Sequence, residues 1–164
     1  MNLRRAITVL VASALLAGCS AYRLGTGEAA SRDIEVMPVR NAAPIPGVHA
    51  VLHQSLVTAL SADRRLRVRS GGDRLETEVT GMERVAATRS TSDALLAGQL
   101  RITLTVRCTL RSADGKATRF ADRPFAATAI ISASADLAGE ERSVLPRLAT
   151  EIAAQVRDAA AGSW

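Results

Sequence analysis

Apolar and polar residues alternate most regularly between residues 101 and 111. One face of an extended chain there would carry Ile102, Leu104, Val106, Cys108 and Leu110, and the other face would carry threonines and arginines. A period of two predicts a strand with one face in the core and one in water. An Asp-Gly pair at 114–115 predicts a hairpin, so a strand over about 117–132 should return antiparallel, with Pro124 at a sheet edge or bulge.

Less regular alternating segments predict three more strands. They cover residues 34–39, 66–69 and 74–89, with a turn predicted at 70–73. In the longest of the three the apolar positions change phase after Gly81, which indicates a bulge there.

Apolar residues recur every three or four positions in two other segments, which is typical of amphipathic helices. The first runs from Val48 to about Asp63 and the second from Val144 to Ala159. Pro146 is compatible with the second helix only if it lies in the first turn. The order strand, helix, strands, helix predicts an α+β fold. We expect a two-layer sandwich, with both helices on one face of a mostly antiparallel sheet of about four strands.

The first 18 residues have the pattern of a bacterial lipoprotein signal peptide. Arg4 and Arg5 precede an uncharged, largely apolar run at 6–16, which is shorter than the roughly 20 residues that span a bilayer. The following Leu-Ala-Gly-Cys resembles a lipobox, which predicts cleavage after Gly18 and lipidation of Cys19. The alternative is an ordinary secretory peptide in which Cys19 merely follows the cleavage site.

This N-terminus divides the chain into a cleaved signal peptide at 1–18, a lipidated N-terminus and tether at 19–32, and a single α+β domain at 33–164. An aspartate after the lipidated cysteine would favour the inner membrane, and Ser20 stands there instead. We therefore expect a lipid anchor in the periplasmic leaflet of the outer membrane. Apart from the N-acyl and S-diacylglycerol lipid on Cys19, no cofactor is expected.

The charge balance is mildly positive, with 21 basic and 16 acidic residues and a formal net charge of +5. No dense basic run occurs, and the four aromatic residues are too few for a base-stacking surface. We therefore expect no nucleic-acid partner.

Candidate catalytic chemistry is sparse. His49 and His53 have the spacing of a helical zinc site, but Ala50 stands where the metalloprotease pattern requires Glu, and no third ligand is evident. We interpret the pair as a solvated helix flank, with adventitious metal binding as the alternative. Cys108 falls on the apolar face of its strand and should be packed and unreactive.

Two further patterns also argue against catalysis. Glu140 and Glu141 are adjacent, so they do not face each other, and acids at a helix start ordinarily serve the helix dipole. No Gly-x-Ser-x-Gly elbow occurs in the chain. We expect a protein without catalytic residues, without a metal and without enzymatic activity.

The mature chain resembles the lipopolysaccharide-assembly lipoprotein family, LptE. Residues 19–24 resemble the segment at the family's lipobox, and 34–41 resemble its first strand, although Met37 and Val39 replace a usual proline and aromatic residue. Residues 47–60 follow the pattern of its first helix, an arginine-rich stretch stands at 64–68 where a short strand follows, and the closing Ala-Gly-Ser-Trp is similar to its C-terminus.

The resemblance implies a non-catalytic lipoprotein that assembles with and plugs the outer-membrane β-barrel of the lipopolysaccharide translocon, an LptD-like partner, and that engages lipopolysaccharide. Four cations near predicted strand ends and hairpin tips are candidates for the lipid A phosphates, namely Arg84, Arg89, Lys116 and Arg119. The alternative for each is a solvated rim.

A lipid-anchored scaffold or auxiliary subunit of another envelope transport or secretion complex is the second hypothesis. A lipoprotein hydrolase is disfavoured because nucleophile and base are missing.

Overall fold

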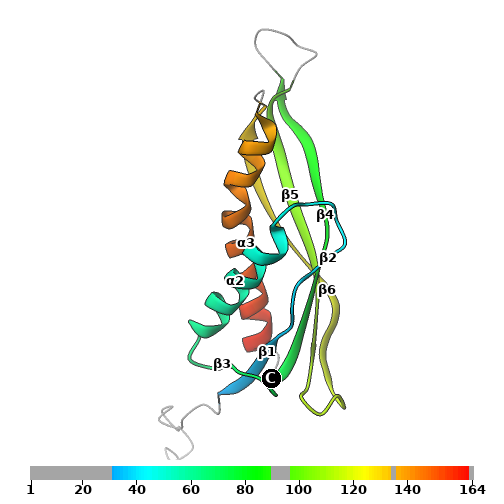
Figure 1. Cartoon of the computed structure of the whole chain (residues 1–164), viewed down its shortest axis with the longest axis vertical. Coiled ribbons are helices and arrows are strands. Elements are labelled where there is room, and N and C mark those ends of the chain that lie inside the picture. Colours follow the sequence, from blue (N-terminus) through cyan, green and yellow to red (C-terminus); the bar gives the residue numbers. More distant parts are fainter. Residues whose placement is uncertain (1–30, 90–96, 134–135, 163–164) are drawn as a thin grey trace, which may run out of the picture. The chain divides into compact units, whose positions relative to one another are not determined.

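In the part of the chain that the structure describes, two helices and a mixed sheet make up the fold (Figure 1). The computed structural model describes residues 31–89, 97–133 and 136–162, so the expected signal peptide, Cys19 and almost all of the tether lie outside the described residues. Along the chain the elements are β1 (Arg32–Val36), β2 (Arg40–Asn41), α2 (Val48–Ser61), β3 (Leu66–Val68), β4 (Asp73–Arg89), β5 (Ala97–Arg111), β6 (Thr118–Ser132) and α3 (Leu137–Gly162).

The sheet has the strand order β3-β1-β4-β5-β6, and β2 also pairs with β4. β1 pairs in parallel with β3 and β4, and β2 pairs in parallel with β4. The α+β class is therefore confirmed, but the described sheet has six strands rather than about four, and three of its five pairings are parallel. The parallel pairing of β1 with β3 arises because α2 connects them as a helical crossover, so that β3 runs in the same direction as β1.

β4, β5 and β6 form a long antiparallel meander. The five alternating apolar positions from Ile102 to Leu110 are all buried, as the alternation predicted. The register shift between Val79 and Gly81 confirms the predicted bulge. The strand order places β6 at a sheet edge, where Pro124 lies opposite Arg107, so the edge prediction is confirmed as well. Gly115 takes a positive φ of 71° in the hairpin between β5 and β6, a conformation that favours glycine.

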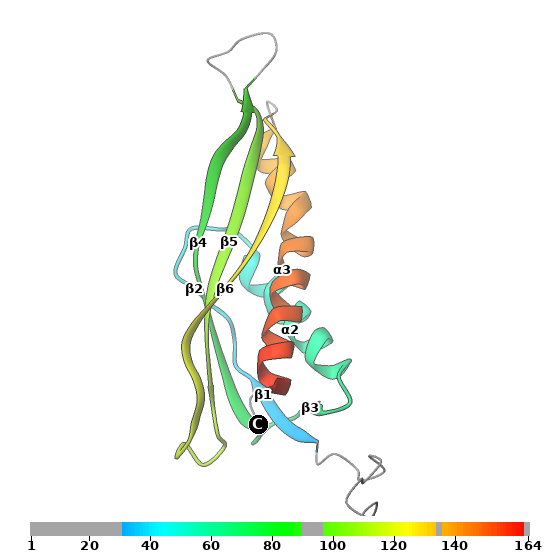
Figure 2. The ribbon, with the colours of Figure 1, turned by 180° about the vertical axis from the view of Figure 1, so that it is seen from behind.

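Both helices cover the same face of the sheet, as Figures 1 and 2 show from opposite sides. α2 buries a narrow stripe spaced every four residues, and α3 buries a wider one that includes several alanines. These stripes meet the inward residues of the strands in one apolar core. None of the described helices has the length and apolarity to cross a membrane.

The predicted start of the second helix is wrong. α3 begins at Leu137, and Pro146 is its tenth residue rather than part of its first turn. Pro146 has no N–H to donate to the carbonyl of Arg142, while its own carbonyl accepts a 2.9 Å hydrogen bond from the Thr150 hydroxyl. The first turns carry Gly139 and charged residues in place of an apolar stripe, so the hydrophobic period does not reveal them.

Candidate functional site

The four cations predicted to meet lipopolysaccharide lie toward opposite ends of the antiparallel meander. Arg84 and Arg89 lie in the second half of β4, whereas Lys116 lies on the β5–β6 hairpin and Arg119 lies near the start of β6. Arg84 is opposite Ile102, while the first residue of β6 is opposite Arg111 at the far end of β5. About nine strand residues, roughly 30 Å, separate the two groups. The structure therefore does not bring these four residues into one site.

Arg84 is held by an acid of α3. Its guanidinium donates two hydrogen bonds to the Glu141 carboxylate, one of them 2.9 Å long from Nη2 to Oε2. The hydrogen bond raises the pKa of Arg84 and lowers that of Glu141. A phosphate at this position would have to compete with Glu141. Arg89, the last residue of β4, pairs through its backbone with Ala97.

Four cations lie at the hairpin end of the sheet, with Arg74 and Arg111 on its outer face and Arg119 beside Asp73 on its inner side. We call Arg74, Arg111, Lys116 and Arg119 the basic cluster. Arg74 lies directly opposite Arg111 in the pairing of β4 with β5, and both are exposed. Like charges in opposite positions repel, so an anion bound between them would relieve this repulsion. Lys116 is exposed on the hairpin, and the Arg119 side chain is 36% exposed.

Asp73 fixes the inner side of this end of the sheet. Its Oδ1 accepts a 3.1 Å hydrogen bond from the Ala113 N–H, and its Oδ2 lies 3.5 Å from the Arg119 Nε and 3.8 Å from the Arg32 Nε. Arg32 also donates to the carbonyl of Ala160 at 3.0 Å. Burial and the charge of Arg119 lower the pKa of Arg32, and Asp73 opposes that shift. One carboxylate therefore faces two guanidinium groups, while Glu35 lies opposite Arg74 on the β1 side and Asp114 lies on the hairpin beside Lys116.

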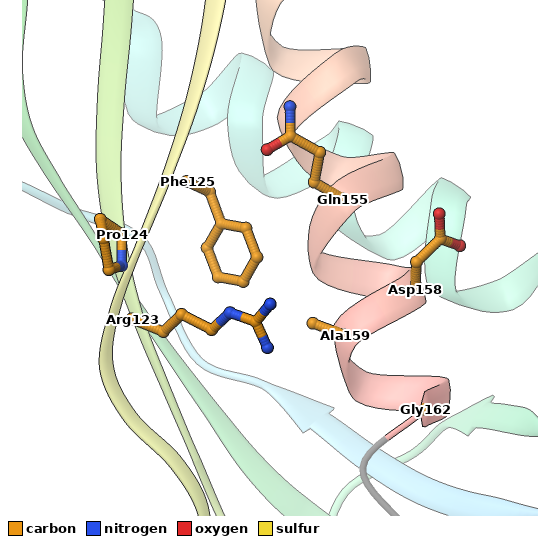
Figure 3. A pocket seen from close by; sticks show the side chains of 7 residues that line it. All are labelled: Arg123, Pro124, Phe125, Gln155, Asp158, Ala159 and Gly162. Atoms are coloured by element: carbon orange, nitrogen blue, oxygen red, sulfur yellow. The ribbon is translucent and has the colours of Figure 1, made fainter.

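A cleft of about 640 Å³ opens between β6 and the C-terminal half of α3 (Figure 3). The Arg123 guanidinium lies 5.3 Å from the centre of the Phe125 ring and points toward α3. On the α3 side, the Gln155 amide donates to the carbonyl of Ala126 at 2.9 Å, and Asp158 accepts hydrogen bonds from Arg157. The cleft thus sets one cation on an aromatic wall, an arrangement suited to an anionic group that carries apolar chain.

Sequence reasoning missed Arg74, Arg111 and Arg123 as candidate ligands. Arg74 and Arg111 stand 37 positions apart in the chain, and only the register of β4 against β5 makes them neighbours. Arg123 and Phe125 share a strand face because they lie two residues apart, but the position of Arg123 beside α3 depends on how the helix packs. The one available signal for Arg74 and Arg111 was their position at the ends of alternating segments.

The other residues singled out from the sequence carry no site in the described part of the chain. His49 is exposed and His53 is partly buried on α2, and the described residues contain no group of three or more His, Cys, Asp or Glu placed to hold a metal ion. Cys108 is buried, as predicted, and its Sγ lies 3.4 Å from the Thr77 hydroxyl. Burial raises the pKa of the Cys108 thiol to about 11. A thiol with this pKa is a poor nucleophile at neutral pH.

Comparison with solved structures shows the fold. A minor lipoprotein of Acinetobacter baumannii matches 79% of this chain and 92% of its own, with 13% identity and a TM-score of 0.52. A Xanthomonas campestris protein matches 79% and 86%, with 16% identity and a TM-score of 0.54. A hypothetical protein of Chlamydia trachomatis matches 78% and 96%, with 12% identity and a TM-score of 0.53. No curated protein sequence matches the chain.

Comparison with protein families identifies the chain itself. The match covers residues 31–160, which include every strand described above and nearly all of α3. The chain belongs to the LptE family, described as lipopolysaccharide-assembly.

Proposed function

We propose that this protein is a lipid-anchored outer-membrane component that assembles with the β-barrel of the lipopolysaccharide translocon, plugs it, and assists transport and insertion of lipopolysaccharide at the cell surface. The family match over residues 31–160 is the observation that carries this proposal. The family acts in assembly without enzymatic activity, and its fold does not depend on a cofactor. The buried thiol of Cys108 agrees with a non-catalytic role.

The lipobox at residues 16–19 supports the anchor. Acyl chains on Cys19 would hold the protein in the bilayer, because each buried CH₂ contributes about 0.8 kcal/mol and the several chains of a bacterial lipoprotein act together. Ser20 after the cysteine supports delivery to the periplasmic leaflet of the outer membrane.

We place the contact with lipid A phosphates at the basic cluster. Two of the cations predicted from the sequence, Lys116 and Arg119, belong to it, and Arg74 and Arg111 add two guanidinium groups that face each other. Guanidinium groups bind phosphate oxygens through two parallel hydrogen bonds, and a phosphate would offset the repulsion between them. Arg84 and Arg89, at the other end of β4, would form a second and separate contact. Glu141 competes for Arg84 there.

A charge-reversal experiment tests the cluster. We expect the double variant Arg111→Glu, Lys116→Glu to lose roughly a hundredfold or more in affinity for purified lipopolysaccharide, since each charge-assisted contact contributes roughly 1.5–3 kcal/mol. Wild-type binding should weaken with added salt. Glu at position 111 would face Arg74 and form an attractive pair, so the fold should not suffer.

The matched control is Arg64→Glu, Arg147→Glu, which changes the net charge equally at exposed arginines of a loop and of α3. Equal loss of binding in both double variants would mean that the interaction reflects net charge alone. Absence of salt-sensitive binding by the wild-type protein would refute the phosphate contact. Failure of the translocon barrel protein to purify with the wild-type chain from detergent-solubilised outer membranes would refute assembly with the barrel and favour the scaffold hypothesis.

A further inference from the structure

β4 has strand partners on both sides over only its first half. β5 pairs with it along nearly its whole length. On the opposite side, β1 pairs with residues 73–75 and β2 pairs with residues 78–79. Within the described ranges, no strand pairs with β4 on this side after Val79. We call the stretch from Thr80 to Ala86 the open edge of β4.

The backbone groups at the open edge can be assigned from the hydrogen bonds below it. The carbonyls of Leu75 and Val79 accept hydrogen bonds from Met37 and Ala42, so these residues direct their backbone groups away from β5. In an antiparallel pair this direction alternates along the strand. The register with β5 carries this alternation past the bulge at Gly81. The backbone N–H and C=O groups of Met82, Arg84 and Ala86 therefore point toward the open edge.

An independent contact on the other side of the sheet agrees with this assignment. Ala126, opposite Thr105 in β5, should direct its backbone groups away from β5 by the same alternation, and its carbonyl accepts the hydrogen bond from Gln155. No hydrogen bond among the described residues joins the backbone of Met82, Arg84 or Ala86 to a residue outside β5. The open edge therefore presents three residues whose donors and acceptors are available to an extended chain.

Exposure changes along β4 where β2 ends. Residues 73, 75, 77 and 79 are buried, whereas Glu83 to Ala86 are all exposed, on both faces of the sheet. Val85 is 46% exposed, one of two large exposed hydrophobic side chains in the described residues. Beside the open edge lie two hollows of about 310 and 140 Å³, whose linings share Pro44, Ile45, Met82 and Arg84. The smaller one also reaches Leu145 of α3 and is mostly apolar.

We propose that an extended segment of the translocon barrel protein adds to the sheet at the open edge of β4, continuing the strand position that β2 occupies. This inference rests on the proposed function. Three observations favour a polypeptide strand. The donors and acceptors alternate with the spacing of a strand, β2 already pairs with the same edge directly below, and the adjoining hollow has a mostly apolar lining on one face. Strands in the wall of a closed barrel have no free edge, so the segment would lie outside that wall. Alternating apolar and polar residues in it would match the apolar hollow on one face and Glu83 on the other.

A proline substitution can test the open edge without removing hydrogen bonds between β4 and β5. The N–H of Ala86 points away from β5, so Ala86→Pro removes no ladder hydrogen bond but withdraws a donor from an incoming strand and places a ring in its path. Ala86→Gly keeps the N–H and serves as the matched control. Ala126→Pro makes the same substitution at the opposite edge, on β6, where the N–H also points away from β5.

The experiment uses the full-length lipidated chain, purified from detergent-solubilised outer membranes, with the translocon barrel protein measured by quantitative mass spectrometry. We expect Ala86→Pro to recover roughly fivefold less barrel protein or worse, which corresponds to the loss of one net backbone hydrogen bond, while Ala86→Gly and Ala126→Pro match the wild type. If Ala86→Pro recovers as much as the wild type, the open-edge proposal is wrong and barrel assembly stands. If the wild type recovers none, the proposed function itself fails.

A second measurement does not depend on the stability of the proline variant. Photocrosslinking residues placed at Glu83 and Val85, which lie two residues apart on the outer face, should both crosslink to one short segment of the barrel protein, at positions about two residues apart. Matched positions Thr128 and Ile130 on β6 should not. Crosslinks that join two copies of this chain, or crosslinks from Glu83 and Val85 to scattered sites, would overturn the proposal.

Discussion

Arg84 of β4 and Glu141 of α3 are joined by two hydrogen bonds between their charged groups, although 57 positions separate them in the chain. The Glu141 side chain is 13% exposed and that of Arg84 is 46% exposed, so the pair lies at the rim of the core. It ties the first turns of α3, which lack an apolar stripe, to the half of β4 that pairs only with β5 among the described strands.

Removal of this pair should destabilise the fold in a pH-dependent way. We expect Arg84→Ala to lower the free energy of unfolding by a few tenths to about 1 kcal/mol near neutral pH, since partly exposed pairs contribute little. Arg84 lowers the pKa of Glu141 below 4.5, so the stabilisation is fully present above that pH and is lost as the pH falls through the folded-state pKa. Urea denaturation at pH 7 and pH 3 measures the difference, and an unchanged gap between wild type and variant at both values would contradict it.

Cys108 should be inert in the native protein and reactive after unfolding. The chain has two cysteines, so thiol chemistry in a Cys19→Ala background reports on Cys108 alone. Because burial raises its pKa from 9.0 to about 11, the native thiol should resist alkylation at pH 8, and denaturant should restore full reactivity. The same shift makes the protonated thiol's contribution to stability fully present below pH 9 and lost as the pH rises to about 11. Rapid labelling of the native protein would contradict burial.

Neutralising Asp73 should destabilise the hairpin end of the sheet. Asp73→Asn keeps a hydrogen-bond acceptor for Ala113 but removes the negative charge that lies 3.8 Å from Arg32 and 3.5 Å from Arg119. We expect the free energy of unfolding to fall by about 1–3 kcal/mol in denaturant titrations. Asp33→Asn is the control, because the Asp33–Arg69 pair is 3.8 Å apart and largely exposed, and its loss should cost less than about 1 kcal/mol. Equal losses of unfolding free energy in the two variants would show that burial of the Asp73 contacts adds nothing to stability.

Lipidation should depend on a single residue. In cells that produce the full chain, Cys19→Ala should abolish incorporation of a radiolabelled fatty acid and leave an uncleaved precursor or a form released into the periplasm. Wild-type protein expressed in parallel provides the control for labelling. Undiminished label in the variant would rule out lipidation at Cys19.

The sequence by itself determined which face of each strand is buried. Alternation over residues 101–111 depends only on neighbouring positions, since successive side chains of any strand point to opposite faces. The bulge at Gly81, the edge position of Pro124 and the burial of Cys108 follow from the same local pattern and are confirmed. The resemblance to the LptE family, stated from scattered motifs, is confirmed by the match over residues 31–160.

Only the tertiary structure decided which strands pair and which charged residues lie opposite each other. A strand pattern specifies a buried face but not the neighbour or its direction, because register depends on hydrogen-bond ladders between distant residues. For this reason the parallel placement of β1 beside β3 and β4, the Arg74–Arg111 opposition and the open edge of β4 have no local signature. The Arg84–Glu141 pair and the early start of α3 likewise depend on packing of that helix against the sheet, which no short-range period encodes.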